Sequence, residues 1–221
     1  MFSKASTIAP TTASPARMLP CAVQSRVFSV GNGVLWAEAD AGIAATQAIV
    51  DVSYGPKSLA LLRAGMTPAA IIKAVLESEP DPRPTDWTKE GRQFAVMDAR
   101  GNYAAYTGPR ATTWAGNKGG KYSTAQGNIL AGEGVVNGMI DAFEKSEGHL
   151  SMRLMAALDA GQAAGGDKRG MQSAAMVIVK KNGGVWLNND VVLRLQVDDS
   201  DEPLKELLRI VEKWNAQRRR R

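Results

Sequence analysis

One stretch, Leu150–Lys180, constrains the fold more than any other part of the chain. Apolar residues recur at helical spacing through its first half, and the apolar stripe ends in Gly161, which permits close approach of a neighbouring element. Gly165 and Gly166 then end the helix, because glycine takes the left-handed conformation without steric cost. The continuous apolar run Ser173–Val179 has the length of a strand that is covered on both faces. The stretch therefore predicts a helix, a tight loop and a buried strand.

The tight loop carries the polar residues Asp167, Lys168, Arg169 and Gln172. A compact loop that holds an acid and an arginine between two buried elements is a good place for a functional site. The alternative is a helix cap with a structural ion pair, and the sequence leaves both interpretations open.

Length and charge favour a single globular domain. The chain has 221 residues, of which 44% are hydrophobic and 22% charged. A chain of this size can bury roughly 70% of its unfolded surface. The net charge is +5, and Arg218–Arg221 supply four of the positive charges. We interpret this tail as a solvated charge run rather than a nucleic-acid arm, since no basic–aromatic interleaving accompanies it. We expect no nucleic-acid partner.

Two residue counts exclude much familiar chemistry. Cys21 is the only cysteine, so the chain forms no intramolecular disulfide and no thiolate metal cluster. Strand alternation predicts that Cys21 is a small buried residue. His149 is the only histidine and stands at an expected helix start on the surface, which argues against a Ser-His-Asp triad or a histidine-ligated metal. We expect no metal and no cofactor.

The sequence also lacks membrane signals. No apolar run approaches the length of a membrane span, and the first residues lack the apolar core of a signal peptide. We therefore expect a cytoplasmic protein without a membrane partner.

The order of the elements predicts the fold class. Residues 3–20 are rich in Ser, Thr, Ala and Pro without any period, so we expect an irregular segment over 1–20, one domain over 21–216 and a basic tail over 217–221. Helices are expected from Tyr54, after the cap Thr67, over 135–146 and 150–163, and after Asp201. Strands are expected at 21–30, 34–39, 42–48, 93–98, 102–107, 122–129, 173–179 and 191–197, with loops at 79–89 and 112–120. Strand pairs interleaved with helices favour an α+β domain with two packed, mainly antiparallel sheets and helices outside, a four-layer αββα sandwich.

Several long strings carry a family resemblance. The chain resembles the bacterial and archaeal family called domain of unknown function 1028 (DUF1028) over roughly Cys21–Glu212, through the strings SRVFSVGNGVLWAEADAGIAATQA, SYGPKSLALLRAG, VMDARGNYAAYTG, YSTAQGNILAG and ALDAGQAAGGDKRGMQSAAMVIV. That family is grouped with the N-terminal nucleophile (Ntn) hydrolases, whose αββα fold agrees with the expectation above. Some relatives carry a peptidoglycan-binding module, which suggests cell-wall-derived substrates.

The resemblance implies an amide hydrolase that needs no histidine. In Ntn enzymes the first residue of the mature chain supplies the nucleophile, and its own α-amine, with a pKa near 8, takes the proton. Ser3 matches the serine of the Thr-Phe-Ser strand with which family members begin, whereas the threonine has no counterpart here. The expected substrate is a small amide or peptide. The alternative is a catalytically inactive protein that binds a small ligand on the same scaffold. A homodimer is a guess from the exposed helical layers.

Polar residues within the matched strings are candidates for the site. Asp167 is a candidate catalytic residue together with Ser3. Arg26 either holds a substrate carboxylate or pairs with Glu38, and each of the aromatic and strand-end candidates either contacts ligand or serves packing and backbone hydrogen bonding. The candidate ligand-binding residues are Ser25, Arg26, Thr46, Gln47, Tyr54, Trp114, Gln126, Asn128, Arg169 and Gln172.

Overall fold

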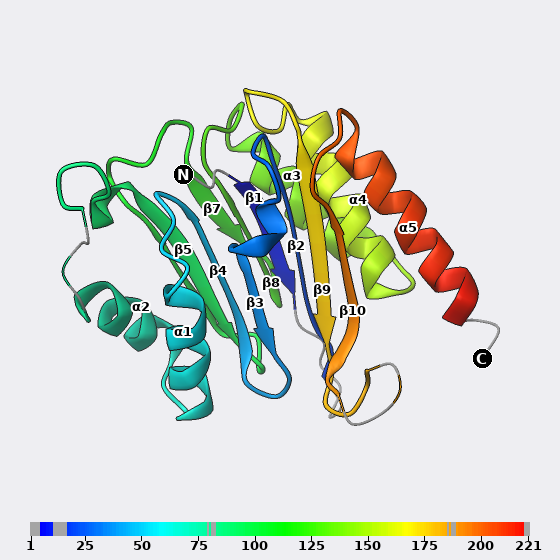
Figure 1. Cartoon of the computed structure of the whole chain (residues 1–221), viewed down its shortest axis with the longest axis horizontal. Coiled ribbons are helices and arrows are strands. Elements are labelled where there is room, and N and C mark those ends of the chain that lie inside the picture. Colours follow the sequence, from blue (N-terminus) through cyan, green and yellow to red (C-terminus); the bar gives the residue numbers. More distant parts are fainter. Residues whose placement is uncertain are drawn as a thin grey trace.

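The structure is a computed structural model and describes residues 5–10, 17–78, 80, 83–184, 186 and 189–218, with the backbone alone for 5–10. Within these residues the chain forms two antiparallel sheets and five α-helices, so the mixed α+β class is confirmed (Figure 1). Ser3 lies outside the described residues.

The larger sheet has six described strands in the order β10-β9-β2-β1-β8-β7. In that order, the strands are Val191–Val197, Ser173–Val179, Leu19–Ser25, Ala5–Pro10, Ser123–Gly127 and Gly116–Gly119. The smaller sheet has four described strands in the order β3-β4-β5-β6, which are Leu35–Glu38, Gly42–Ala48, Arg92–Asp98 and Tyr103–Thr107. Every paired strand runs antiparallel to its neighbours.

Each sheet has its own helices. Buried side chains of α1 (Tyr54–Arg63) and α2 (Pro68–Glu77) pack against β4 and β5 of the smaller sheet. The helices α3 (Gly134–Lys145), α4 (Leu150–Ala163) and α5 (Pro203–Arg218) pack against the larger sheet. Figure 1 shows these two helix groups on opposite sides of the sheets.

The inner faces of the two sheets contact each other through apolar side chains. Cys21 of β2 and Val177 of β9 lie in one cluster with Ile43 of β4. The strands β2, β4 and β9 are buried along their whole length, as the continuous apolar run predicts for β9. Cys21 is fully buried, as predicted.

The structure of residues 5–10 contradicts one expectation. Residues 1–20 were expected to be irregular, but Ala5–Pro10 forms β1 and pairs with β2 on one side and β8 on the other. Leu19 and Pro20 also belong to β2. The sequence ASTIAP has no alternation of apolar and polar residues, because a strand with neighbours on both sides is held by pairing that a local pattern does not reveal.

Two boundaries differ from the expectation as well. The strand expected over 21–30 ends at Ser25, and Val30–Asn32 is a short 3-10 turn. The loop expected over 112–120 contains β7, a polar edge strand that is held by pairing with β8.

The helices α3 and α4 approach each other at Gly161. A Cβ placed there would lie 2.8 Å from Met139 Cγ of α3. Any larger residue at this position must displace the Met139 side chain. The helix ends as predicted, with Gly165 and Gly166 at φ +105° and +49°.

The substitution Gly161→Val tests this contact. We expect it to lower the free energy of unfolding by about 2 kcal/mol, because the added atoms force α3 and α4 apart. Ala163→Val, at the exposed end of the same helix, carries only the loss in helix propensity of about 0.5 kcal/mol. Urea unfolding measures both variants, and an equal effect would contradict the tight packing at Gly161.

Candidate functional site

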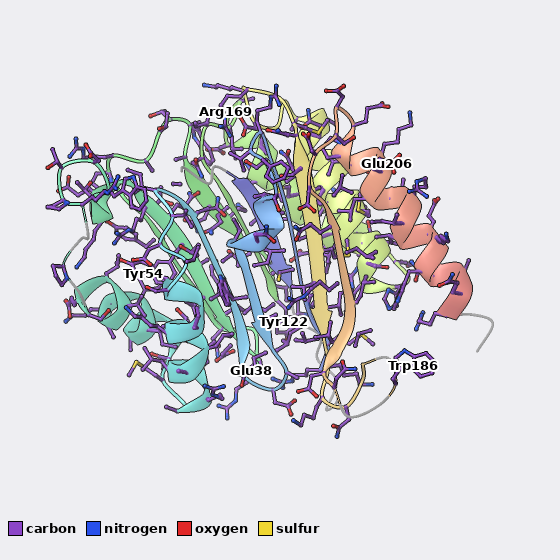
Figure 2. All side chains as sticks on the ribbon, viewed as in Figure 1. Glu38, Tyr54, Tyr122, Arg169, Trp186 and Glu206 are labelled. Carbon is purple, nitrogen blue, oxygen red and sulfur yellow. The ribbon has the colours of Figure 1, made fainter. Side chains whose placement is uncertain are left out.

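Polar side chains gather where several strands of both sheets end or begin. The strand β4 ends near Gln47 and β5 begins near Gln93, and these two residues are register partners. The strand β8 of the facing sheet ends just after Gln126, and Asn128 follows. Antiparallel pairing brings these ends to one edge of the molecule. Figure 2 shows Arg169 at this upper end, whereas Tyr122, which precedes β8, lies toward the lower end.

Four carboxamides form a hydrogen-bonded network between the sheets. Gln93 Oε1 accepts from Gln47 Nε2 at 2.9 Å and from Asn128 Nδ2 at 3.2 Å. Gln126 Nε2 donates to Gln47 Oε1 at 3.2 Å and to the carbonyl of Ala45 at 3.2 Å. The four side chains are buried, so each bond lies out of water. The network is called the amide cluster below.

Gln93 is the centre of the amide cluster. Its Nε2 donates to Thr107 Oγ1 at 2.9 Å within the smaller sheet. The same atom donates to the carbonyls of Gly127 at 2.9 Å and Gly116 at 3.2 Å in the larger sheet. Gln93 was not predicted as a site residue, since one glutamine in an apolar strand does not reveal partners that are distant in sequence.

Three buried side-chain oxygens, two of them in the amide cluster, have no hydrogen-bond partner among the described residues. Gln126 Oε1, Asn128 Oδ1 and Ser25 Oγ remain unpaired across the described residues. Ser25 is fully buried at the end of β2, and its carbonyl accepts from the N–H of Gln172 at 2.9 Å. A buried acceptor without a partner is destabilising, so these atoms mark places where a ligand or water would be bound.

The loop that follows α4 covers the same end of the larger sheet. Ala131 N–H donates to the carbonyl of Gly166 at 3.0 Å, and Lys168 N–H donates to the carbonyl of Ile129 at 2.9 Å. At the other end of the loop, the N–H of Gln172 donates to the carbonyl of Ser25. The loop thus spans from the end of β8 to the end of β2, across the strand between them, β1.

Asp167 lies in this loop and is 3% exposed. Its Oδ1 accepts from the N–H and the Nε of Arg169, both at 2.9 Å, and its Oδ2 accepts from Arg169 Nη2 at 2.5 Å. The acid and the arginine therefore form the ion pair that the sequence analysis allowed. This pair fixes the guanidinium of Arg169 at the partly exposed rim of the loop.

Tyr54 belongs to a separate cluster on the helix-covered face of the smaller sheet. Its hydroxyl accepts from Arg92 Nη1 at 2.5 Å, and its ring contacts Phe94 edge to face. Arg92 is 2% exposed, and its Nη2 lies 3.8 Å from Asp51 Oδ2. The sequence analysis missed Arg92 and Asp51. Thr46 points to this face as well and donates to the carbonyl of Asp51, so Thr46 and Gln47 point in opposite directions.

The remaining predicted residues do not join the amide cluster. Arg26 is exposed, and the expected alternative pairing with Glu38 is wrong, because both oxygens of Glu38 accept from Arg63. Trp114 is half-buried and packs against the core of the larger sheet. Gln172 Nε2 donates to Asp199 Oδ1 at 3.0 Å.

Cys21 and His149 take no part in this site. Burial raises the pKa of the Cys21 thiol, which keeps it protonated and unreactive. His149 caps α4, where its Nδ1 accepts from the N–H of Ser151 at 3.2 Å. Across the described residues, no group of three or more His, Cys, Asp or Glu side chains is placed to hold a metal ion. None of the helices that the structure describes has the length and apolar character needed to cross a membrane.

Comparison with known proteins identifies the family. A family model described as a family of unknown function, DUF1028, matches residues 11–207. The chain belongs to the DUF1028 family. A crystal structure of protein SPO2555 from Silicibacter pomeroyi, a DUF1028 protein, is 27% identical and superposes with a TM-score of 0.83, over 96% of this chain and 89% of that chain. A comparison with curated proteins found no match.

The amide cluster predicts a stability effect at Gln93. Gln93→Met keeps the volume but leaves the carbonyl of Gly127 and the amides of Gln47 and Asn128 without this partner. We expect the free energy of unfolding to fall by about 3 kcal/mol. Gln217→Met, on the exposed end of α5, should change it by less than about 0.5 kcal/mol. Denaturant unfolding compares the two, and a Gln93 variant as stable as the control would show that the cluster does not hold the sheets together.

The surroundings of His149 predict that the free energy of unfolding depends on pH. Burial, and then the charge of Arg218, lower its pKa from 6.5 to about 4. The folded state therefore favours the neutral ring, so the stabilisation from this cap is complete above pH 6.5 and declines as the pH falls toward 4. His149→Asn retains a capping side chain that does not titrate. The stability advantage of the native protein over this variant should shrink across that range in chemical unfolding, and a constant advantage would refute the assignment.

Proposed function

We propose that the chain is an Ntn-type hydrolase of a small amide or peptide, with its elements arranged as the four-layer αββα sandwich of that class. One observation carries the proposal: β1 begins in the middle of the larger sheet, at the end where the polar residues gather. Ala5 is the register partner of Ser25, and Ser6 is the partner of Gly127. The loop that holds Asp167 and Arg169 crosses the same end.

The chemistry follows from this position. A hydroxyl at the first residue of a processed chain would attack the substrate carbonyl, and the adjacent α-amine would accept the hydroxyl proton. Ser3 precedes β1, and Ser6 and Thr7 are its second and third residues, so these three are the hydroxyl residues near its start. The leaving amine then takes that proton, and water hydrolyses the acyl-enzyme ester by the same route.

The surrounding side chains have separate roles in this proposal. The unpaired oxygens of Asn128 and Gln126 are acceptors that orient an amine or an amide N–H. Arg169, held by Asp167, and the exposed Arg26 supply guanidinium groups for a substrate carboxylate. Asp167 acts here by positioning Arg169, since three hydrogen bonds from that residue occupy its carboxylate.

Two measurements test this proposal: the identity of the first residue of the purified chain, and the hydrolysis of small amides. Intact mass and N-terminal sequencing of the purified protein should show a chain that begins with Ser or Thr near the start of β1. Replacing that residue by Ala should abolish release of amine from a panel of small peptides and N-acyl amino acids, with the far-UV CD spectrum unchanged. Ser78→Ala, at the end of α2, should retain full activity.

The alternative is a catalytically inactive binding protein on the same scaffold. It is supported by the unpaired buried oxygens of Ser25, Gln126 and Asn128, which can contact a ligand without a catalytic step. An intact amino terminus, with saturable binding of a small amide and no turnover, would contradict the hydrolase and support this alternative.

A further inference from the structure

A pocket lies at the open edge between the two sheets, and its lining does not include any residue of the amide cluster. The larger sheet has six described strands and the smaller has four, so β9 and β10 extend beyond the edge strand β3. The result is a cavity of about 280 Å³ whose lining includes Asn32, Trp36, Leu59, Arg194 and Gln196. Figure 1 shows β3 at the edge of the smaller sheet, with β9 and β10 of the larger sheet to its right.

Arg194 is the charged group of this pocket. Leu193 and Leu195 pack toward the core of the larger sheet, so the alternating residues Arg194 and Gln196 point to the inner face. Arg194 is the register partner of Val177, which pairs in turn with Cys21. Arg194 is exposed, and no described residue forms a hydrogen bond or an ion pair with its guanidinium. A charged residue that points inward on an edge strand can instead serve only to prevent aggregation. Binding measurements on Arg194 variants distinguish this role from ligand binding.

The wall opposite Arg194 is the edge of β3, which offers backbone groups. The carbonyl of Val34 accepts from the N–H of Thr46, 3.1 Å away. Hydrogen-bonded pairs alternate along an antiparallel ladder, so the N–H and C=O groups of Leu35 and Ala37 point away from β4, toward the pocket. Unpaired groups of this kind accept an added extended segment.

A rigid polar cluster closes one end of the pocket. Gln196 Nε2 donates to Ser29 Oγ at 3.0 Å and to Asn32 Oδ1 at 3.3 Å. Ser29 Oγ donates to Asp198 Oδ1 at 2.5 Å. A Cβ at Gly31 would lie only 2.6 Å from Ala175 Cβ of β9, so glycine is required where the turn meets this strand. The cluster fixes Gln196 on the same face of β10 as Arg194.

We propose that this pocket binds a short extended peptide or N-acyl amino acid through its carboxylate. The carboxylate pairs with Arg194, and the peptide group of the ligand pairs with Leu35 and Ala37 on the edge of β3. A volume of 280 Å³ lies near the lower end of small-molecule sites, which suits a ligand of dipeptide size. This binding site does not depend on the proposed hydrolase activity.

The test uses N-acetyl-Ala-Ala and its C-terminal amide as probes, titrated separately into the ¹⁵N-labelled full-length protein. The acid should cause saturable amide shifts at Leu35, Ala37 and Gln196. The C-terminal amide should bind about tenfold more weakly or worse, because it lacks the charge that Arg194 recognises.

Variants complete the test. Arg194→Gln should weaken binding of the acid by about tenfold or more, whereas Arg209→Gln, which removes a surface arginine of α5 that pairs with Glu206, should leave it unchanged. Equal binding of the two probes, or shifts that map to Gln126 and Asn128 instead, would overturn the proposal. So would concentration-dependent shifts of the β3 residues without any probe, because a second copy of the chain would then occupy the edge.

Discussion

The carboxamide of Gln93 is the interaction on which the arrangement of the polar site depends. It extends from the smaller sheet, yet it donates to carbonyls at the end of β8 and in β7 of the larger one. It also receives the amides of Gln47 and Asn128, which belong to different sheets. Each such bond contributes about 1 kcal/mol net, but loss of one partner leaves buried groups unpaired at a larger cost. The network therefore fixes how the strand ends meet, and these ends define the candidate site.

The larger sheet is wider than the smaller one, and this difference determines where the candidate binding regions lie. Apolar contacts join the sheets where β2 and β9 face β4, and the central side chains of this contact zone are buried. At the strand ends, polar side chains replace the apolar ones, and at the edge beyond β3 the larger sheet is left uncovered. The two candidate binding regions thus lie where the apolar contact between the sheets stops. Both owe their rigidity to the same buried strands.

Long periodic stretches allowed the sequence to predict much of this fold. The helix α4 and the strands β4, β9 and β10 have the predicted bounds, because an apolar face or a continuous apolar run specifies each of them locally. The strand β1 was not predictable in this way, since its residues carry no pattern and its position depends on pairing with β2 and β8. A local sequence pattern indicates whether a segment is buried, but it does not indicate which strands pair with it.

The candidate site shows the same limit. Gln47, Gln126 and Asn128 were predicted as candidates, and the structure brings them together. Gln93, which joins them, was missed because its partners lie far away in the sequence. Tyr54 was predicted for the same pocket but faces the helices, where it contacts Arg92. The alternation along β4 and β5 decides which polar residues meet, and this depends on register rather than on residue type.

The central claim is that β1 is an inner strand of the larger sheet, with its first residues among the polar strand ends. Hydrogen exchange of the backbone amides of residues 6–9, followed by mass spectrometry, tests it most directly. Each of these amides faces a paired strand, so the claim predicts slow exchange, comparable to that of Ser173–Val179 in β9. Exchange as fast as that of an unstructured peptide would contradict it and would leave the candidate site without its central strand.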